Sequence, residues 1–239
     1  MSNANHNEAD ASCATQTNTH TDITTSPTSD NDNSSFIVRL ASDDRDNAHV
    51  EAITDMINAA YQVGEKCIIV DSNEHPFHRV TVDDVQQLLR DGKLLILTTT
   101  ATSKEEQEKV LGCVKVEAIQ VRDSDDPLLG QKCCEWGCLT VAVEEQQQGH
   151  GRRLVQAAEE YARNELGCTW LQLELLSPAN ERHAHKDMLR EWYTTRLGYQ
   201  LQWVNDHEKS SIRFPKGKLL LGIVRLATDA DFTIYRKQL

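Results

Sequence analysis

The sequence predicts an α/β (α+β) fold with a mixed central sheet, and three observations lead to that prediction. Short apolar runs typical of strands are interspersed with segments whose apolar residues recur at helical spacing. Three consecutive strands are expected between residues 93 and 143, and such strands can pair as an antiparallel meander. A glycine turn at residues 146–151 then joins a strand to a helix, and a strand–helix–strand unit crosses over to a parallel neighbour.

The first half of the ordered chain is expected to hold two helices and four strands. Apolar residues at i, i+3, i+4 and i+7 put the first helix at residues 46–61. Thr81 with Asp84 three positions later forms a capping box that starts the second helix, which Gly92 ends. The strands are expected at residues 36–41, 93–100, 110–121 and 133–143.

The second half is expected to alternate helices and strands. A helix with one apolar stripe covers residues 152–166 and ends at Gly167. A strand with leucines on one face follows at residues 169–176. A further helix covers residues 186–197 and stops at Gly198. The last two strands are expected at residues 199–204 and 219–226.

Residues 1–34 differ in composition from the rest of the 239-residue chain. They are rich in Ser, Thr, Asn and Asp and have almost no large apolar residues, so folding them would bury too little surface to offset the ordering entropy. We expect a disordered extension over residues 1–34 and a single domain over residues 35–239.

Charge and hydropathy exclude several classes of protein. The net charge is −12, from 37 acidic and 25 basic residues, which argues against a broad positive face for nucleic acid. No run approaches the ~18 apolar residues that a membrane helix requires. The start of the chain lacks an apolar signal core and an Arg-rich transit character. We therefore expect a soluble cytoplasmic protein.

Seven cysteines are an odd number in a chain large enough to build its own core. This argues against a disulfide framework and for a reducing compartment. The cluster at residues 133–138 has no second Cys or His pair at zinc-site spacing, so we expect buried strand cysteines and no metal.

The most informative feature is the hexapeptide Gln146-Gln147-Gln148-Gly149-His150-Gly151. Between a strand and a helix, it points backbone N–H groups and the positive end of a helix dipole at one spot, which suits a phosphate or pyrophosphate. Gly149 and Gly151 allow an anion to approach closely because they lack a Cβ. The alternative is an ordinary glycine turn without a ligand.

Three phosphate-loop patterns compete for this hexapeptide. A Walker loop needs Gly-Lys-Ser/Thr, but two arginines follow Gly151. A dinucleotide fingerprint needs a third glycine where Leu154 stands. Gln146, Gly149 and Gly151 do fit Gln/Arg-x-x-Gly-x-Gly/Ala, which resembles the acyl-CoA pyrophosphate loop of the GNAT acetyltransferase superfamily.

The resemblance extends over residues 36–227. Residues 139–154 match the central motif of the family, and Trp192-Tyr193-Thr-Thr-Arg-Leu-Gly-Tyr199 matches its second signature. The resemblance implies a mixed, mostly antiparallel sheet of about seven strands, splayed between strands 4 and 5 and flanked by about four helices.

The resemblance also implies acetyl-CoA as co-substrate. Backbone N–H groups from about Gln146 to Leu154 would cradle its pyrophosphate, and Arg152 or Arg153 would reach a phosphate. The pantetheine arm would pair with the strand before the loop, through main-chain groups of Leu139, Val141 and Val143. Asn180 resembles an Asn that follows the fifth strand in the family.

The implied chemistry is direct attack of a neutral amine on the thioester. The Val141 N–H matches the oxyanion position, and Glu135 or Glu174 would act as base, directly or through water. Glu117 is a third candidate, and an ordinary exposed strand glutamate is the alternative for each.

Tyr193 is the candidate acid for the departing thiolate, but its spacing is unusual. In the family pattern the Tyr stands four residues before the Gly, whereas Tyr193 stands five before Gly198 and Thr194 holds the fourth place. One residue on a helix is a rotation of about 100°. Either the turn before Gly198 is longer, or Tyr193 is a packing residue.

The acceptor and two other function classes stay open. We expect an N-acetyltransferase acting on a small-molecule or peptide amine, as a monomer or homodimer, and the acidic balance favours a cationic acceptor. An insertion at residues 181–187, with His183 and His185, is expected at the acceptor mouth. One alternative is a non-catalytic acyl-CoA binding or sensing module. The other is an interaction protein that holds a basic partner with its acidic tail and the loop at 123–132.

Overall fold

A computed structural model describes residues 36–71, 77–100, 108–122, 124, 126–202, 211–220 and 224–239, so the tail predicted over residues 1–34 lies outside it. The helices are α1 (Asp43–Asp46), α2 (Val50–Gly64), α3 (Val82–Arg90), α4 (His150–Asn164) and α5 (Ala184–Glu191), with 3-10 turns at Asn47–His49 and Val143–Glu145 and a π-helical turn at Trp192–Arg196. The strands are β1 (Phe36–Leu40), β2 (Leu94–Thr99), β3 (Val110–Ile119), β4 (Cys133–Val141), β5 (Trp170–Pro178), β6 (Gln200–Leu201), β7 (Ser211–Phe214), β8 (Leu219–Leu220), β9 (Val224–Arg225) and β10 (Ala230–Gln238).

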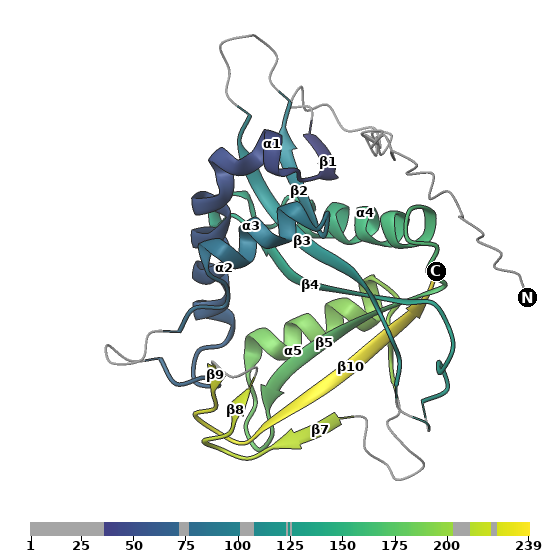
Figure 1. The fold of residues 1–239 in the computed structure, drawn as a ribbon. Coiled ribbons are helices and arrows are strands. Elements are labelled where there is room, and N and C mark those ends of the chain that lie inside the picture. The colour runs from purple at the N-terminus through teal and green to yellow at the C-terminus, as the bar shows by residue number, and fades with distance from the viewer. Residues whose placement is uncertain are drawn as a thin grey trace, which may run out of the picture.

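One sheet holds most of the strands (Figure 1). Its order is β1-β2-β3-β4-β5-β10-β6, with β7 also paired to β10, while β8 and β9 form a separate pair. Every pairing between named strands is antiparallel except β4–β5, which is parallel. The predicted mixed, mostly antiparallel sheet is confirmed.

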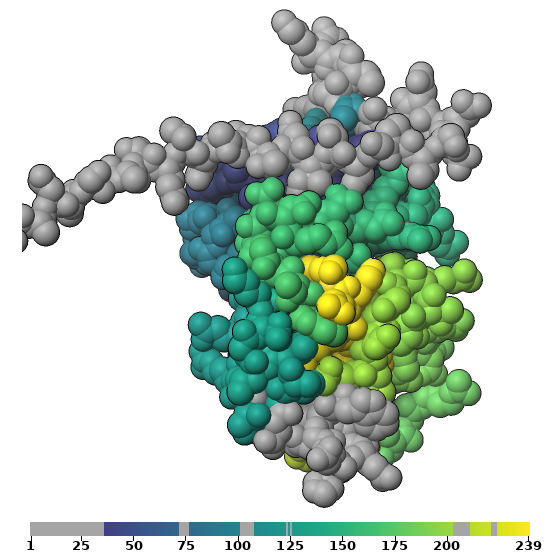
Figure 2. Space-filling view, turned by 90° about the vertical axis from the view of Figure 1, so that its right-hand side faces the viewer, coloured from purple at the N-terminus to yellow at the C-terminus, as the bar shows by residue number. Residues whose placement is uncertain are grey.

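Helices cover both faces of this sheet. Leu95 and Leu97 of β2 share a core cluster with Leu154 of α4, whereas Leu94 and Ile96 share the opposite cluster with residues of α2 and α3. In Figure 2 the end of β10, in yellow, lies against α4, in green, where Lys237 pairs with Glu159 at 2.8 Å. Because both faces are packed, β2 reads as a continuous apolar run.

The C-terminal strands differ from the prediction. The prediction of one continuous strand at residues 219–226 is wrong, because the described residues of this range form two short antiparallel strands, β8 and β9. Of residues 199–204, only Gln200–Leu201 is a described strand. The main partner of β5 is instead β10, which sequence analysis missed. Polar residues interrupt β10, and the partners that neutralise its buried Arg236 are far away in the chain.

Two further points concern the predicted helices and cysteines. The capping box of Thr81 and Asp84 is present at the start of α3. The cysteine count argued against a disulfide framework and for buried strand cysteines, but Cys134 on β4 forms one disulfide with Cys168 before β5. Cys133 and Cys138 are buried free thiols, as the strand interpretation predicts. None of the described helices has the length and apolar character needed to cross a membrane.

Candidate active site

Strands β4 and β5 pair over a short stretch and then diverge. They pair only at Cys133–Trp170, Cys134–Leu171 and Glu135–Gln172. The cause lies on the other edge of β4, where the step from Cys113 to Lys115 on β3 faces the longer step from Thr140 to Gly137. β4 therefore has one extra residue in a β-bulge, where Cys138 has φ of 51°. Such a bulge bends the strand that contains it. The splay implied by the family resemblance is therefore present.

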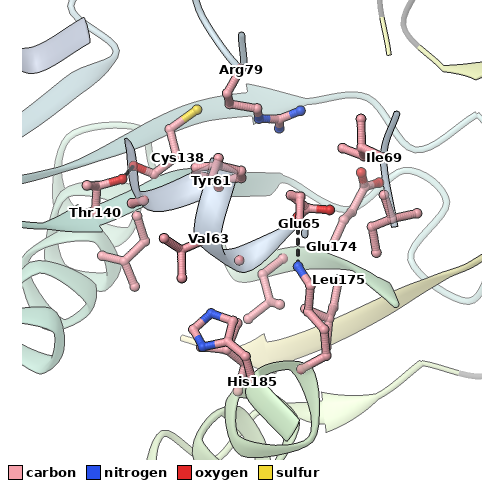
Figure 3. A pocket seen from close by; sticks show the side chains of 18 of the residues that line it. Tyr61, Val63, Glu65, Ile69, Arg79, Cys138, Thr140, Glu174, Leu175 and His185 are labelled. Atoms are coloured by element: carbon pink, nitrogen blue, oxygen red, sulfur yellow. Dashed lines mark hydrogen bonds and ion pairs between the residues drawn. The ribbon is translucent and has the colours of Figure 1, made fainter. Parts of the chain in front are cut away.

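A cavity of about 770 Å³ fills the gap that the splay opens (Figure 3). Its walls are the second half of β4, the middle of β5, the C-terminal end of α2, and α5 with the π-helical turn. Aromatic and aliphatic side chains from β7, β8, β9 and β10 close one end. This arrangement suits a ligand that enters between two strands like an added strand.

The backbone of Val141 faces this gap. Ala142 N donates to Leu111 O at 2.9 Å, so the preceding pair, Val141 with Gly112, is the non-hydrogen-bonded kind. The N–H and C=O of Val141 consequently point away from β3. The side-chain amide of Gln146 donates to Val141 O at 3.2 Å, which leaves the Val141 N–H as the group that faces an incoming ligand.

Gly112 makes this close approach of β3 and β4 possible. A Cβ on Gly112 would lie 2.6 Å from Thr140 O and 3.0 Å from Leu154 Cδ1. Backbone atoms cannot yield at that distance, so the position requires glycine. The strand predicted to run to residue 143 ends at Val141, and Val143 begins a 3-10 turn. Leu139 and Val143 both border the cavity.

The hexapeptide forms an open cradle at the start of α4. Gly149 has φ of 82° and Gln147 has φ of 64°, so the chain turns sharply before the helix. In the described part of the chain, no hydrogen bond is made by the backbone N–H groups from Gln147 to Arg152. Nothing lies within 4 Å of a Cβ placed on Gly149, so the cradle has room for an anion.

Side chains around the cradle divide into exposed and buried groups. Gln148, Arg152 and Arg153 are exposed, and the Arg153 guanidinium lies 5.6 Å from the ring centroid of Phe36. His150 is buried against Phe36 with neither ring nitrogen hydrogen-bonded. Burial lowers its pKa, with Arg153 adding to the effect. Asn180 lies elsewhere: it is exposed, bonds to Asp229 at 3.4 Å and does not border the cavity.

The three candidate glutamates have different surroundings. Glu174 borders the cavity, and partial burial together with the charge of Glu135 raises its pKa to about 7. Glu135 also borders the cavity and accepts a hydrogen bond from Gln172. Glu117 lies outside the cavity lining and pairs with Lys115 and Lys93, which lower its pKa against the opposing effect of burial. Glu174 thus has the pKa that a base at neutral pH needs.

The π-helical turn explains the spacing of Tyr193. Leu197 N donates to Trp192 O at 3.1 Å, five residues back, which adds one residue to the last turn before Gly198. The extra residue rotates Tyr193 into the cavity and leaves Thr194 exposed. The Tyr193 ring packs on Trp136 with centroids 5.6 Å apart, and burial raises the pKa of its hydroxyl. The longer turn is therefore present, while the role of Tyr193 as an acid stays a prediction.

Several polar residues that border the cavity were not predicted from the sequence. Among them are Tyr61 and Glu65 from the end of α2, Arg79 before α3, and Lys186 on α5. Lys186 Nζ lies 2.7 Å from Glu65 Oε1, and both side chains are buried (Figure 3). No local pattern marks these residues, since the two ends of that ion pair are 121 positions apart. His185 also borders the cavity, whereas His183 caps α5.

Comparisons with known proteins agree with this geometry. The profile of the Acetyltransferase (GNAT) family matches residues 66–199. A GNAT family acetyltransferase from Listeria monocytogenes 4b F2365 superposes with a TM-score of 0.54 at 15% identity, covering 85% of this chain and 95% of that one. Arabidopsis thaliana NAA60 gives 0.51 at 12% in complex with a bisubstrate analogue, covering 85% and 100%. Its complex with acetyl-CoA gives 0.50 at 10%, covering 86% and 100%.

A search of curated proteins by sequence found no match. At the identities above, the solved structures show the fold alone, and the family match carries the assignment because it spans more than half of the chain. The chain therefore belongs to the GNAT family of acetyltransferases.

Proposed function

We propose that the protein is an acetyl-CoA-dependent N-acetyltransferase that moves an acetyl group to a primary amine by direct attack in a ternary complex. The observation that carries this proposal is the convergence of three groups on one cavity. They belong to Val141 on β4, Glu174 on β5 and Tyr193 on the π-helical turn, which all line it.

The donor would be held by the cradle and the splay. The N–H groups of residues 147–152 would bind the pyrophosphate, with Arg152 or Arg153 adding a charge-assisted bond. The pantetheine arm would lie along Leu139 to Val143 in the gap beside β4. The thioester would then lie next to the Val141 N–H.

Each group in the cavity has one step to perform. Glu174 takes a proton from the amine, whose nitrogen then bonds to the thioester carbon. The Val141 N–H stabilises the oxyanion that forms, and the C–S bond breaks as the amide is completed. Tyr193 gives its proton to the departing thiolate and is reprotonated through solvent at the expense of Glu174. The net products are an N-acetylated amine and CoA.

Two measurements test this proposal. Calorimetry should detect acetyl-CoA binding by the full chain, and Gly149→Asp should weaken it at least tenfold by placing a carboxylate in the cradle. The matched control is Gly217→Asp, because Gly217 also has φ of 82° and open space around its Cβ position. CoA release with a panel of amines then separates an enzyme from a sensing module. Binding without turnover of any amine would identify the module, and no binding would refute both.

A further inference from the structure

The cavity contains a cation that makes no ion pair with a carboxylate of the described residues. Arg79 borders the cavity, its Nε atom is buried without a hydrogen-bond partner, and no carboxylate lies within ion-pair distance of its guanidinium in the described part of the chain. Its guanidinium carbon lies 5.1 Å from the centroid of the Tyr61 ring, and both side chains line the cavity (Figure 3). The Arg79 side chain is half-buried and its Nε donor is unused, so an anionic group in the cavity would gain a charge-assisted hydrogen bond there.

The position of Arg79 is fixed by the helix opposite it. The side-chain oxygen of Asn58 on α2 accepts hydrogen bonds from Arg79 N at 2.7 Å and Val80 N at 3.1 Å, and its amide donates to Val80 O at 2.9 Å. These three bonds clamp the segment before α3 to α2. The guanidinium is therefore presented to the cavity by a rigid backbone.

Most other charged side chains around the cavity have hydrogen-bond or ion-pair partners. Lys186 pairs with Glu65 at 2.7 Å, Lys115 pairs with Glu117, and Glu135 accepts a hydrogen bond from Gln172. Lys218, at the rim, is exposed. Three further charged groups that border the cavity have no ion-pair partner among the described residues: Arg79, Glu174 on β5, and Glu135, whose hydrogen bond comes from the neutral Gln172. An acceptor with one anionic and one basic group would complement Arg79 and this pair of carboxylates.

Apolar side chains line the end of the cavity near these groups. Ile69, Phe77 and Leu176 belong to a buried cluster against which Phe214 and Phe232 pack, and all five border the cavity. This lining favours an aromatic or branched aliphatic body over a polyamine chain, because an ammonium among these apolar side chains would lose its hydration without a carboxylate in the same cluster.

We propose that the acceptor is an amphipathic amino acid, with its amine at Glu174, its carboxylate held by the Arg79 guanidinium and its apolar side chain in the Phe77–Phe232 end of the cavity. This inference rests on the proposed function for the fate of the amine, but the anion site stands on its own geometry. It replaces the cationic acceptor that net charge alone favours.

Binding of a carboxylate that has no amine tests the anion site apart from catalysis. Calorimetry of the full chain, with and without saturating CoA, compares 3-phenylpropanoate with neutral 3-phenylpropanol. We expect the carboxylate to bind at least about tenfold more tightly, because a hydrogen-bonded ion pair is formed. Arg79→Met should abolish this preference, and Arg79→Lys should keep part of it. Arg190→Met, at an exposed arginine on α5, should leave it unchanged.

Turnover gives the second readout. We expect phenylalanine to exceed 2-phenylethylamine at least tenfold in kcat/KM, and Arg79→Met to remove the difference while the affinity for CoA stays the same. Equal affinities of the wild-type chain for 3-phenylpropanoate and 3-phenylpropanol would overturn the inference. Loss of CoA affinity in Arg79→Met would also overturn it. Failure of the proposed function looks different, since acetyl-CoA then does not bind or no amine is acetylated even where 3-phenylpropanoate binds through Arg79.

Discussion

The side-chain amide of Gln172 donates a hydrogen bond of 3.0 Å to Oε2 of Glu135. Arg236 in turn donates from Nε to Gln172 Oε1 at 3.0 Å, and its two terminal nitrogens reach Asp126 at 2.7 Å each. Four side chains from β4, β5, β10 and the loop before β4 thus form one chain of contacts. It fixes the Glu135 carboxylate where its charge raises the pKa of Glu174.

Glu135→Gln should move the pH dependence of catalysis. The pKa of Glu174 is raised to about 7 by burial first and by Glu135 second, so removing the charge of Glu135 lowers that pKa. Because the base must be deprotonated, kcat rises as pH passes its pKa. The acidic limb of the kcat profile should therefore shift to lower pH in the variant. Glu191→Gln, at an exposed glutamate of α5, should leave the limb in place.

Glu174→Gln should remove the base itself. We expect kcat to fall by about 10²–10⁴-fold, the usual contribution of general base catalysis. The dissociation constant of acetyl-CoA, measured by calorimetry, should not change. A variant that keeps wild-type kcat would show that Glu174 lines the cavity without acting as the base.

Tyr193→Phe and Thr194→Val together decide which residue before Gly198 serves as acid. The phenyl ring keeps the packing against Trp136, so the unfolding midpoint should change little while kcat falls at least tenfold. Thr194 is exposed and bonds to Arg190 O at 2.9 Å, so its substitution should leave kcat unaffected. The opposite result would return Tyr193 to the role of a packing residue.

Gly112→Ala should destabilise the fold by about 1–3 kcal/mol, the usual cost of forcing extra atoms into a packed site. The added methyl group would meet Thr140 O at 2.6 Å, whereas on Gly137 of the neighbouring strand it would meet nothing closer than Lys115 Cε at 3.9 Å. Urea unfolding of Gly112→Ala and Gly137→Ala compares the two. Equal free energies of unfolding would show that β3 can retreat from β4.

His150→Phe should flatten the pH dependence of stability below neutral pH. Burial lowers the pKa of His150 from its ordinary value of 6.5, so below that pH the unfolded chain takes up a proton that the folded chain does not. The free energy of unfolding therefore falls on acidification, by at most about 1.4 kcal/mol per pH unit for one group. Urea unfolding between pH 7.5 and 5 should show a smaller slope for His150→Phe. The exposed His78, changed to Phe, should keep the wild-type slope.

The elements next to the proposed acetyl-CoA site could be predicted from the sequence because they depend on local interactions. The capping box at Thr81, the glycine cradle at residues 149–151 and the strand before it depend on neighbours a few positions away. Such features follow from backbone conformation and hydrophobic period, which a single segment contains. The last strand, β10, could not be predicted in this way, because its charged residues are neutralised by distant partners. Arg236 pairs with Asp126, and Lys237 pairs with Glu159.

By itself, the sequence determined the order of the main helices and strands, the glycine turn at residues 146–151 and the family. Tertiary structure alone decided how wide β4 and β5 part, which face of its helix Tyr193 occupies and which charges share the cavity. The bulge at Cys138 and the π-helical turn each depend on one extra residue whose accommodation is set by packing. Arg79 and Glu174, nearly one hundred positions apart in the chain, border the same cavity only because the strands and helices close around it.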